Sequence, residues 1–240
     1  MDGVFSQELR LKNRDVDMYR RLRTSRLFEL LQEAAIAHTE ALGMGREKTL
    51  DRGLLWVVTL QRAEIARMPE YDEKIRVEGW PGETMHVLFP RYYRIVGEGG
   101  GELVRASALW MLVDEKSRRF VFPERFGIAI GGVETGRELP LPTAPAAMAT
   151  DGEREFSVPY SYVDLNGHMN NTRYFDLAED CVGAAAEGRE LHAVATEYKA
   201  EARLGDRLFL RWGGDGDRFF LSGGAERPVF TISLEYRKKI

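Results

Sequence analysis

Two stretches of the chain resemble each other, and this internal repeat is the feature that most constrains the fold. The first, DVDMYRRLRTSRLFEL, occupies positions 15–30, and the second, YVDLNGHMNNTRYFDL, occupies positions 162–177. With a constant offset of 147 residues, Asp17 aligns with Asp164, and matching apolar and aromatic residues follow in both. A chain that carries the same segment twice is expected to fold as two copies of one structural unit.

A second pair of similar segments follows in the same order. EKIRVEGW ends at Trp80 and DRLFLRWG contains Trp212, which gives an offset of 132 residues. Between the copies, the segment 136–152 holds three prolines among small residues. Because proline fixes φ and removes a backbone donor, this composition predicts an extended linker. We therefore expect an N-terminal unit at 1–135 and a C-terminal unit at 153–240.

Each unit has the pattern of one helix followed by antiparallel strands, which is an α+β arrangement. Thr24 or Ser25 is expected to cap the first helix, and Gly43 to end it. Asn170 or Asn171 is expected to cap the second helix. Its apolar stripe comprises Tyr174, Ala178, Cys181 and Ala185. The expected strands are 5–12, 54–66, 74–79, 85–96, 103–113, 119–122, 193–202, 207–212, 218–222 and 229–237.

The second copy contains a dense group of polar residues just before its helix. Asp164, Asn166 and His168 are spaced by two, so an extended backbone would point all three to one side. The positive end of the following helix suits a reaction that develops negative charge on oxygen, such as acyl transfer. Histidine can pass a proton near neutral pH. The same residues also suit a plain turn. Because Tyr19 and Arg21 replace the Asn and His in the first copy, we expect one site per chain.

Other titratable residues give weaker indications. Glu201 lies on a strand face with other charged residues, where solvated side chains are usual. His38 falls on an apolar helix face, whereas His86 and His192 lack acidic or cysteine neighbours at metal-ligand spacing. Cys181 is the single cysteine, so neither a disulfide nor a cysteine zinc cluster is possible. We expect no metal and no cofactor.

Composition and charge exclude several classes of protein. The net charge of −4 disfavours nucleic-acid binding by bulk charge. The apolar runs are shorter than the roughly 20 residues of a membrane span. The first residues lack the pattern of a signal peptide, so the expected location is the cytoplasm. Positions 10–26 carry seven basic and two acidic residues, which indicates either a solvated face or a surface that attracts an acidic partner.

Four segments, taken together, resemble a known family. DLNGHMNNTRYFDLAED at 164–180 resembles the D-x-N-x-H-x-N-N-x-x-Y signature of acyl-acyl carrier protein (acyl-ACP) thioesterases of plants and bacteria. Similar in the same way are TEYKAEARLGDRL at 196–208, ALWMLVDEKSRRFVFP at 108–123 and ARMPEYDEKIRVEGWP at 66–81. The resemblance implies a tandem hotdog fold, in which each of two units wraps an antiparallel sheet around a long helix.

The resemblance also implies an activity and its residues. It assigns Asp164, Asn166, His168 and Glu201 as catalytic, in the hydrolysis of fatty acyl-ACP thioesters at the end of fatty acid synthesis. Plant members have a cysteine where this chain has Ala202, so the implied mechanism uses activated water. An acyl tunnel is implied in the N-terminal unit. Candidates for its lining are Leu27, Leu31 and Ala35.

The implied partner is an acidic acyl carrier protein. We expect it to dock on the basic run that includes Arg20, Arg21 and Arg23, together with the basic residues of 116–119. An acyl-CoA thioesterase and a non-catalytic acyl-sensing module are the alternatives, whereas the Asn-rich signature disfavours a hotdog dehydratase. The repeat leaves the oligomeric state open, a homodimer included.

Overall fold

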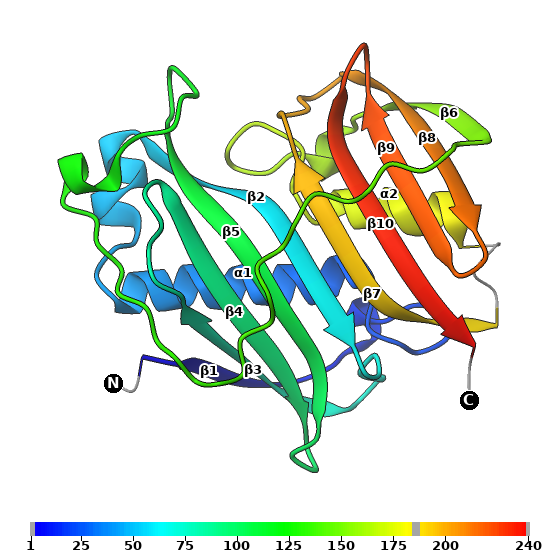
Figure 1. The fold of residues 1–240 in the computed structure, drawn as a ribbon, viewed down its shortest axis with the longest axis horizontal. Coiled ribbons are helices and arrows are strands. Elements are labelled where there is room, and N and C mark those ends of the chain that lie inside the picture. Colours follow the sequence, from blue (N-terminus) through cyan, green and yellow to red (C-terminus); the bar gives the residue numbers. More distant parts are fainter. Residues whose placement is uncertain (1–2, 184–187, 239–240) are drawn as a thin grey trace.

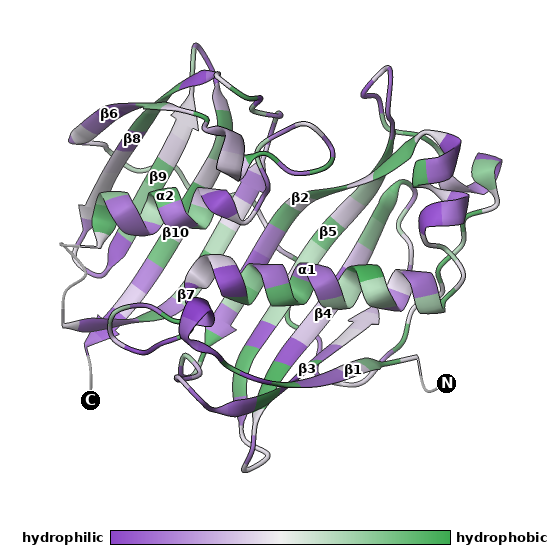
Figure 2. Cartoon of the chain, turned by 180° about the vertical axis from the view of Figure 1, so that it is seen from behind, coloured by the Kyte–Doolittle hydropathy of each residue, from purple (hydrophilic) through white to green (hydrophobic). Residues whose placement is uncertain are grey.

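The computed structural model describes residues 3–183 and 188–238, in which ten strands form one sheet and two helices cover one of its faces (Figures 1 and 2). The helices are α1 (Thr24–Ala41) and α2 (Arg173–Val182). The strands are β1 (Phe5–Arg10), β2 (Leu54–Ile65), β3 (Lys74–Pro81), β4 (Leu88–Gly97), β5 (Glu102–Asp114), β6 (Gly152–Ser157), β7 (Arg189–Tyr198), β8 (Arg207–Asp215), β9 (Arg218–Gly224) and β10 (Pro228–Lys238).

The strand order shows two similar halves. It reads β1-β3-β4-β5-β2-β7-β10-β9-β8-β6, and every pair is antiparallel. The first five strands and α1 belong to the N-terminal unit, and the last five and α2 belong to the C-terminal unit. β2 and β7 join the halves at the centre, where Gln61 pairs with Thr196. This is the predicted tandem hotdog architecture.

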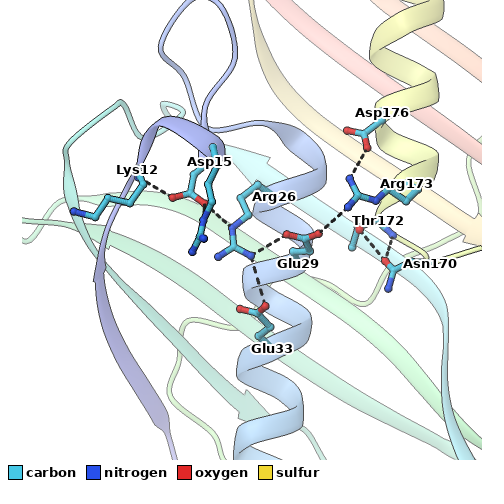
Figure 3. Close-up of polar contacts among 10 residues, drawn as sticks. Lys12, Asp15, Arg26, Glu29, Glu33, Asn170, Thr172, Arg173 and Asp176 are labelled. Atoms are coloured by element: carbon cyan, nitrogen blue, oxygen red, sulfur yellow. Dashed lines mark hydrogen bonds and ion pairs between the residues drawn. The ribbon is translucent and has the colours of Figure 1, made fainter. Parts of the chain in front are cut away.

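The two helices meet at equivalent positions of the repeat. The rings of Phe28 and Phe175 stack with their centroids 4.1 Å apart and their planes 8° apart, and both residues are buried. Arg173 of α2 lies 3.8 Å from Glu29 of α1, which adds a polar contact beside the stack (Figure 3). Aromatic stacking of buried rings stabilises beyond the burial of their area, so this pair fixes the two units against each other.

The repeat extends to the hydrogen bonds of the turn before each helix. The Asp17 N–H donates to the Arg21 carbonyl at 2.8 Å, and the Asp164 N–H donates to the His168 carbonyl at 3.0 Å. The offset of 147 residues is therefore confirmed at the level of single bonds. The residues with left-handed backbone in these turns are Arg20, with φ of 66°, and Gly167, with φ of 80°.

The alignment of the two tryptophans is wrong by one residue. Phe5 pairs with Gly79 across β1 and β3, whereas Gly152 pairs with Trp212 across β6 and β8. Because Phe5 corresponds to Gly152, the counterpart of Trp212 is Gly79, and the true offset there is 133. Trp80 is the next residue along β3, so its side chain lies on the other face of the sheet.

The strand predictions differ from the structure in three main places. Residues 119–122 form no strand, since Phe120 makes only an isolated bridge to Val113 before a 3₁₀ turn at Pro123–Phe126. β7 ends at Tyr198, four residues earlier than expected. β6 was not predicted, because GEREFS is a charged edge strand without apolar alternation. Its place could have been found from the offset of 147, which maps β1 onto it.

The segment between the units lies along the sheet. Residues 127–151 contain no helix or strand and cross the face opposite the helices (Figure 1). The Ser107 hydroxyl donates to the Pro140 carbonyl at 2.8 Å, and the Trp80 indole N–H donates to Glu138 at 3.1 Å. Gly152, the last residue of the predicted linker, already belongs to β6. Within the described residues, no helix is long and apolar enough to cross a membrane.

Candidate active site

The polar group of the C-terminal unit lies in a turn and not in extended backbone. Val163 and Met169 form an isolated bridge, and the residues between them reverse the chain before α2. The Asp164 carboxylate accepts the Asn166 N–H at 2.8 Å and the Asn170 side-chain N–H at 3.2 Å. Of the two conformations that the sequence left open, the structure has the turn, because these local bonds favour it. Asp164 holds the turn together.

One backbone hydrogen bond brings two distant segments to the same place. The Met169 N–H donates to the Ala202 carbonyl at 2.7 Å. The residues that precede them, His168 and Glu201, therefore become neighbours, with His168 Nε2 3.9 Å from Glu201 Oε1. Both are partly buried, with side chains 14% and 27% exposed. Glu201 follows the end of β7, so it leaves the strand face on which the sequence placed it.

A cation from the other unit completes this cluster. Arg118 Nη1, from the loop after β5, lies 3.0 Å from Glu201 Oε1. Arg203 Nη2 lies 3.8 Å from Glu201 Oε2. The sequence placed Arg118 on a docking surface, and it lies instead against the carboxylate. Only its position in a segment that resembles the family indicated importance, because no spacing links positions 118 and 201.

The turn faces a cavity of about 220 Å³ between α1 and the sheet. Asp164, Asn166 and His168 all line it, whereas Glu201 does not line it and contacts the site only through its neighbour His168. Of the three residues expected to line a tunnel, Ala35 does so, and Leu27 and Leu31 are buried in the core. The rest of the wall is mainly apolar and comes from the N-terminal unit, including Ile36, Leu54, Leu55, Trp56, Phe89 and Trp110.

The two helices begin in different ways. The Asn170 side-chain oxygen accepts the Thr172 N–H at 2.9 Å in the turn ahead of α2. The N-cap of α2 is Thr172, so the prediction that Asn170 or Asn171 caps this helix is wrong. Neither Thr24 nor Ser25 caps α1, because α1 already begins at Thr24. The Thr24 hydroxyl instead donates to the carboxylate of Glu179, which comes from α2. A side chain of one unit thus satisfies the end of a helix in the other.

Ion pairs at the same offset strengthen both helix starts (Figure 3). Arg26 Nη1 lies 2.8 Å from Glu29, and Arg173 Nη1 lies 3.1 Å from Asp176, which are equivalent pairs three residues apart. Arg26 also bonds to the buried Asp15 at 2.9 Å. These basic residues therefore serve the framework of the two units.

The remaining histidines and the cysteine lie outside this turn. His38 is buried, and desolvation together with Arg91 lowers its pKa from 6.5 to about 4. His86 is exposed, and His192 faces the Ile65 carbonyl. Cys181 is half-buried, and burial raises the pKa of its thiol. In the part of the chain that the structure describes, no three His, Cys, Asp or Glu side chains gather as metal ligands.

The basic run lies at the N-terminal end of α1. Arg20 and Arg23 are exposed and form no ion pair with the described residues, whereas Arg21 pairs with Asp17 at 3.4 Å. The cavity lies along the other half of the helix, from Gln32 onwards. Arg20 and Arg23 are thus available to a partner, and so are Lys116 and Arg119, which are also exposed and form no ion pair with the described residues.

Comparisons with known proteins agree with this architecture. Family models for the acyl-ACP thioesterase N-terminal and C-terminal domains match residues 2–124 and 146–213. A chloroplastic acyl-(acyl-carrier-protein) hydrolase of Cuphea viscosissima is 27% identical over 221 residues, covering 84% of this chain and 53% of that protein. This chain spans about half the length of the curated relatives it matches.

Two solved structures show the same fold at low sequence identity. An acyl-ACP thioesterase from Bacteroides thetaiotaomicron has a TM-score of 0.83 and 19% identity, and 98% of each chain is covered. A 12:0-ACP thioesterase from Umbellularia californica has a TM-score of 0.82 and 19% identity, with 100% of this chain and 99% of that chain covered. Because its two family models together cover most of the sequence, the chain belongs to the acyl-ACP thioesterase family.

Proposed function

We propose that the protein hydrolyses fatty acyl-ACP thioesters to free fatty acid and carrier protein by activated water, ending chain synthesis. The observation that supports this most is the pairing of His168 with Glu201 at the wall of a largely apolar cavity. A proton-accepting pair beside an apolar cavity suits a substrate with a fatty chain and a hydrolysable carbonyl.

His168 and Glu201 would hold the attacking water and take its proton. Their separation of 3.9 Å is too long for a direct hydrogen bond, and it is a distance that one bridging water spans. The water oxygen then attacks the thioester carbonyl, the carbon–sulfur bond breaks, and the proton passes to the leaving thiolate. Arg118 would act as a positioning residue, because its guanidinium forms an ion pair with the Glu201 carboxylate. Ala202 offers no nucleophile, so no covalent intermediate forms there.

The oxyanion of the tetrahedral intermediate would lie beside Asn166 and the start of α2. The Asn166 side chain lines the cavity and carries N–H donors. The N-terminal end of α2 adds partial positive charge near the same turn. Donors aimed at a developing charge are the main source of acceleration in acyl transfer. Asp164 would orient Asn166 and Asn170 through the bonds described above.

In this proposal the two units divide the work. The N-terminal unit (1–135) supplies the walls of the acyl cavity, residues 136–152 link the units, and the C-terminal unit (153–240) supplies the catalytic residues.

The acidic carrier would dock on the basic run, with Arg20 and Arg23 as exposed cations. Reversing the charge of both should raise KM for carrier-bound substrate and leave small thioesters unaffected. Equal losses on both substrates would contradict this docking surface.

The decisive experiment measures free fatty acid released from a panel of acyl-ACP substrates. We expect release by the wild type and a loss of about 10²-fold or more with Glu201→Gln. Glu197→Gln is the matched control, because Glu197 lies on β7 and pairs with Lys199 at 3.0 Å. Equal activity of the wild type and Glu201→Gln would contradict the proposed mechanism.

Two alternatives predict other results in the same assay. An acyl-CoA thioesterase would hydrolyse acyl-CoA faster than the carrier-bound chain of equal length. An acyl-sensing module would bind the acyl carrier without releasing acid, and His168→Ala would leave that binding unchanged. Parallel assays of both substrates, with a binding measurement on His168→Ala, therefore separate the three functions.

A further inference from the structure

A buried cation without an acidic partner lies in the wall of the cavity. Arg91 on β4 is 4% exposed and is one of the lining residues. Among the described residues, no carboxylate forms an ion pair with it. Arg94, on the same strand, pairs in the usual way with Glu78. Arg91 therefore differs from Arg94, whose charge is balanced by a carboxylate.

The groups that touch Arg91 are neutral. Its Nη1 lies 3.1 Å from His38 Nδ1, and its Nη2 donates to the Thr39 hydroxyl at 2.6 Å. Arginine has only donors, so His38 accepts through Nδ1. Both neighbours belong to the last turns of α1, whose carbonyl end offers only partial negative charge. A buried charge with such incomplete compensation is costly unless a ligand completes it.

The surroundings of Arg91 contain further donors. The Trp56 indole N–H belongs to a lining residue and has no hydrogen-bond acceptor among the described residues. Glu40 also lines the cavity, yet it is exposed and accepts the Arg46 N–H at 2.8 Å. A cavity for a purely alkyl chain has no use for a guanidinium. The donors here fit an oxygen acceptor carried by the ligand.

Arg91 and His168 line this one cavity from different elements. His168 lies in the turn before α2, whereas Arg91 bonds to Thr39 near the end of α1. From Gln32, the first lining residue of α1, to Thr39 the helix rises by about 10 Å. A chain whose thioester lies at His168 and which runs along α1 would bring its far end to Arg91.

We propose that Arg91 binds a carboxylate at the far end of the acyl chain, so that the substrates include half-thioesters of dicarboxylic acids. The proposal rests on the proposed function and adds a substrate class to it. The guanidinium keeps free N–H donors beside those used by His38 and Thr39, and a carboxylate is the group that matches them in charge and geometry. Arg91 is then a specificity-determining residue and takes no part in proton transfer.

The test uses pairs of carrier-bound thioesters with equal numbers of carbons, one ending in a methyl group and one in a carboxylate. We expect the wild type to have the higher kcat/KM for the carboxylate chain. Arg91→Met should lower that preference by about tenfold, the value of one charge-assisted hydrogen bond. Arg91→Lys should retain part of it, and Arg94→Met should leave it unchanged. An unchanged preference in Arg91→Met, or no preference in the wild type, would overturn the proposal.

A binding measurement keeps the proposal testable if Arg91→Met does not fold. Calorimetry on the wild type should show tighter binding of a dicarboxylate than of the matching fatty acid, and Thr39→Val should weaken only the dicarboxylate. Equal binding of both acids would overturn the subsite. Hydrolysis of methyl-ended chains alone would overturn the subsite and leave the proposed function in place. Dicarboxylate binding without hydrolysis of any thioester would overturn the proposed function and leave the subsite in place.

Discussion

The turn before α1 and the turn before α2 have the same backbone and different side chains. In the first, the Leu22 N–H donates to the Pro69 carbonyl at 2.8 Å, and in the second the Met169 N–H donates to the Ala202 carbonyl at 2.7 Å. The duplicated backbone therefore builds the same meeting point of two segments in each unit. Chemistry depends on which side chains occupy it.

The aspartate is shared, since Asp17 aligns with Asp164, and the occupants differ at the positions of the His168–Glu201 pair. His168 corresponds to Arg21, and Glu201 corresponds to Met68, a buried apolar residue. The helices differ as well, since α1 has 18 residues and α2 has 10. The longer helix covers the cavity that the second turn faces. In the proposed mechanism, one copy thus supplies the proton-accepting groups and the other supplies most of the cavity wall.

We expect the largest effect from the histidine of the second turn. His168→Ala should lower kcat for a fatty acyl thioester by about 10²–10⁴-fold, because it removes a group that takes the proton of water. Arg21→Ala at the equivalent position should leave the hydrolysis of a small, carrier-free thioester unchanged. Similar losses in both variants would show that the two turns do not divide the work as proposed.

The next effect concerns the cation that reaches across the units. Arg118→Met should lower kcat about tenfold, because the Glu201 carboxylate loses its partner at 3.0 Å. Arg118→Lys should recover part of the rate. A double-mutant cycle with Glu201→Gln measures the coupling, and losses that simply add would contradict a joint role.

The backbone arrangement was the predictable part of the molecule. The offset of 147 residues located both turns and both helices, since it depends on local patterns that recur. The alignment of Trp80 with Trp212 failed by one residue because similar side chains occur on both faces of a strand pair. β6 was missed because charged edge strands lack the alternation that marks a half-buried strand.

The candidate site was only partly predictable, for a different reason. Asp164, Asn166 and His168 are close in sequence, so their shared place at one cavity was predictable, although the spacing argument assumed an extended backbone. Glu201 was assigned to the same site only through the resemblance to a family. Arg118 and Arg91 escaped notice as site residues because their contacts join segments from different loops and strands. Sequence spacing carries no information on such contacts.

A smaller effect is expected from the left-handed position of the two turns. Gly167→Ala should lower the free energy of unfolding by about 1 kcal/mol, because a side chain disfavours positive φ. No atom lies within 4 Å of the added Cβ, so backbone strain is the only cost. Arg20→Gly should raise the free energy of unfolding by less than about 1 kcal/mol. Glycine relieves the backbone strain at this position, but it also loses more entropy on folding. Urea unfolding of both variants measures the two changes, and a more stable Gly167→Ala or a less stable Arg20→Gly would contradict the shared geometry.

The most subtle contrast is between Glu179 of α2 and its counterpart in α1, the uncharged Gln32. Glu179 accepts the Thr24 hydroxyl, and burial raises the pKa of its carboxyl above the usual 4.5. With a raised pKa in the folded state, its contribution to stability is complete below pH 4.5 and is lost as the pH rises through the folded pKa. Glu179→Gln keeps an acceptor for Thr24 without the charge. The free energy of unfolding of this variant, measured in urea at pH 5 and pH 8, should therefore fall less with pH than that of the wild type. Parallel pH dependence in the two proteins would show that the Glu179 carboxyl carries no such cost. The two helices would then differ in sequence at this point without differing in energy.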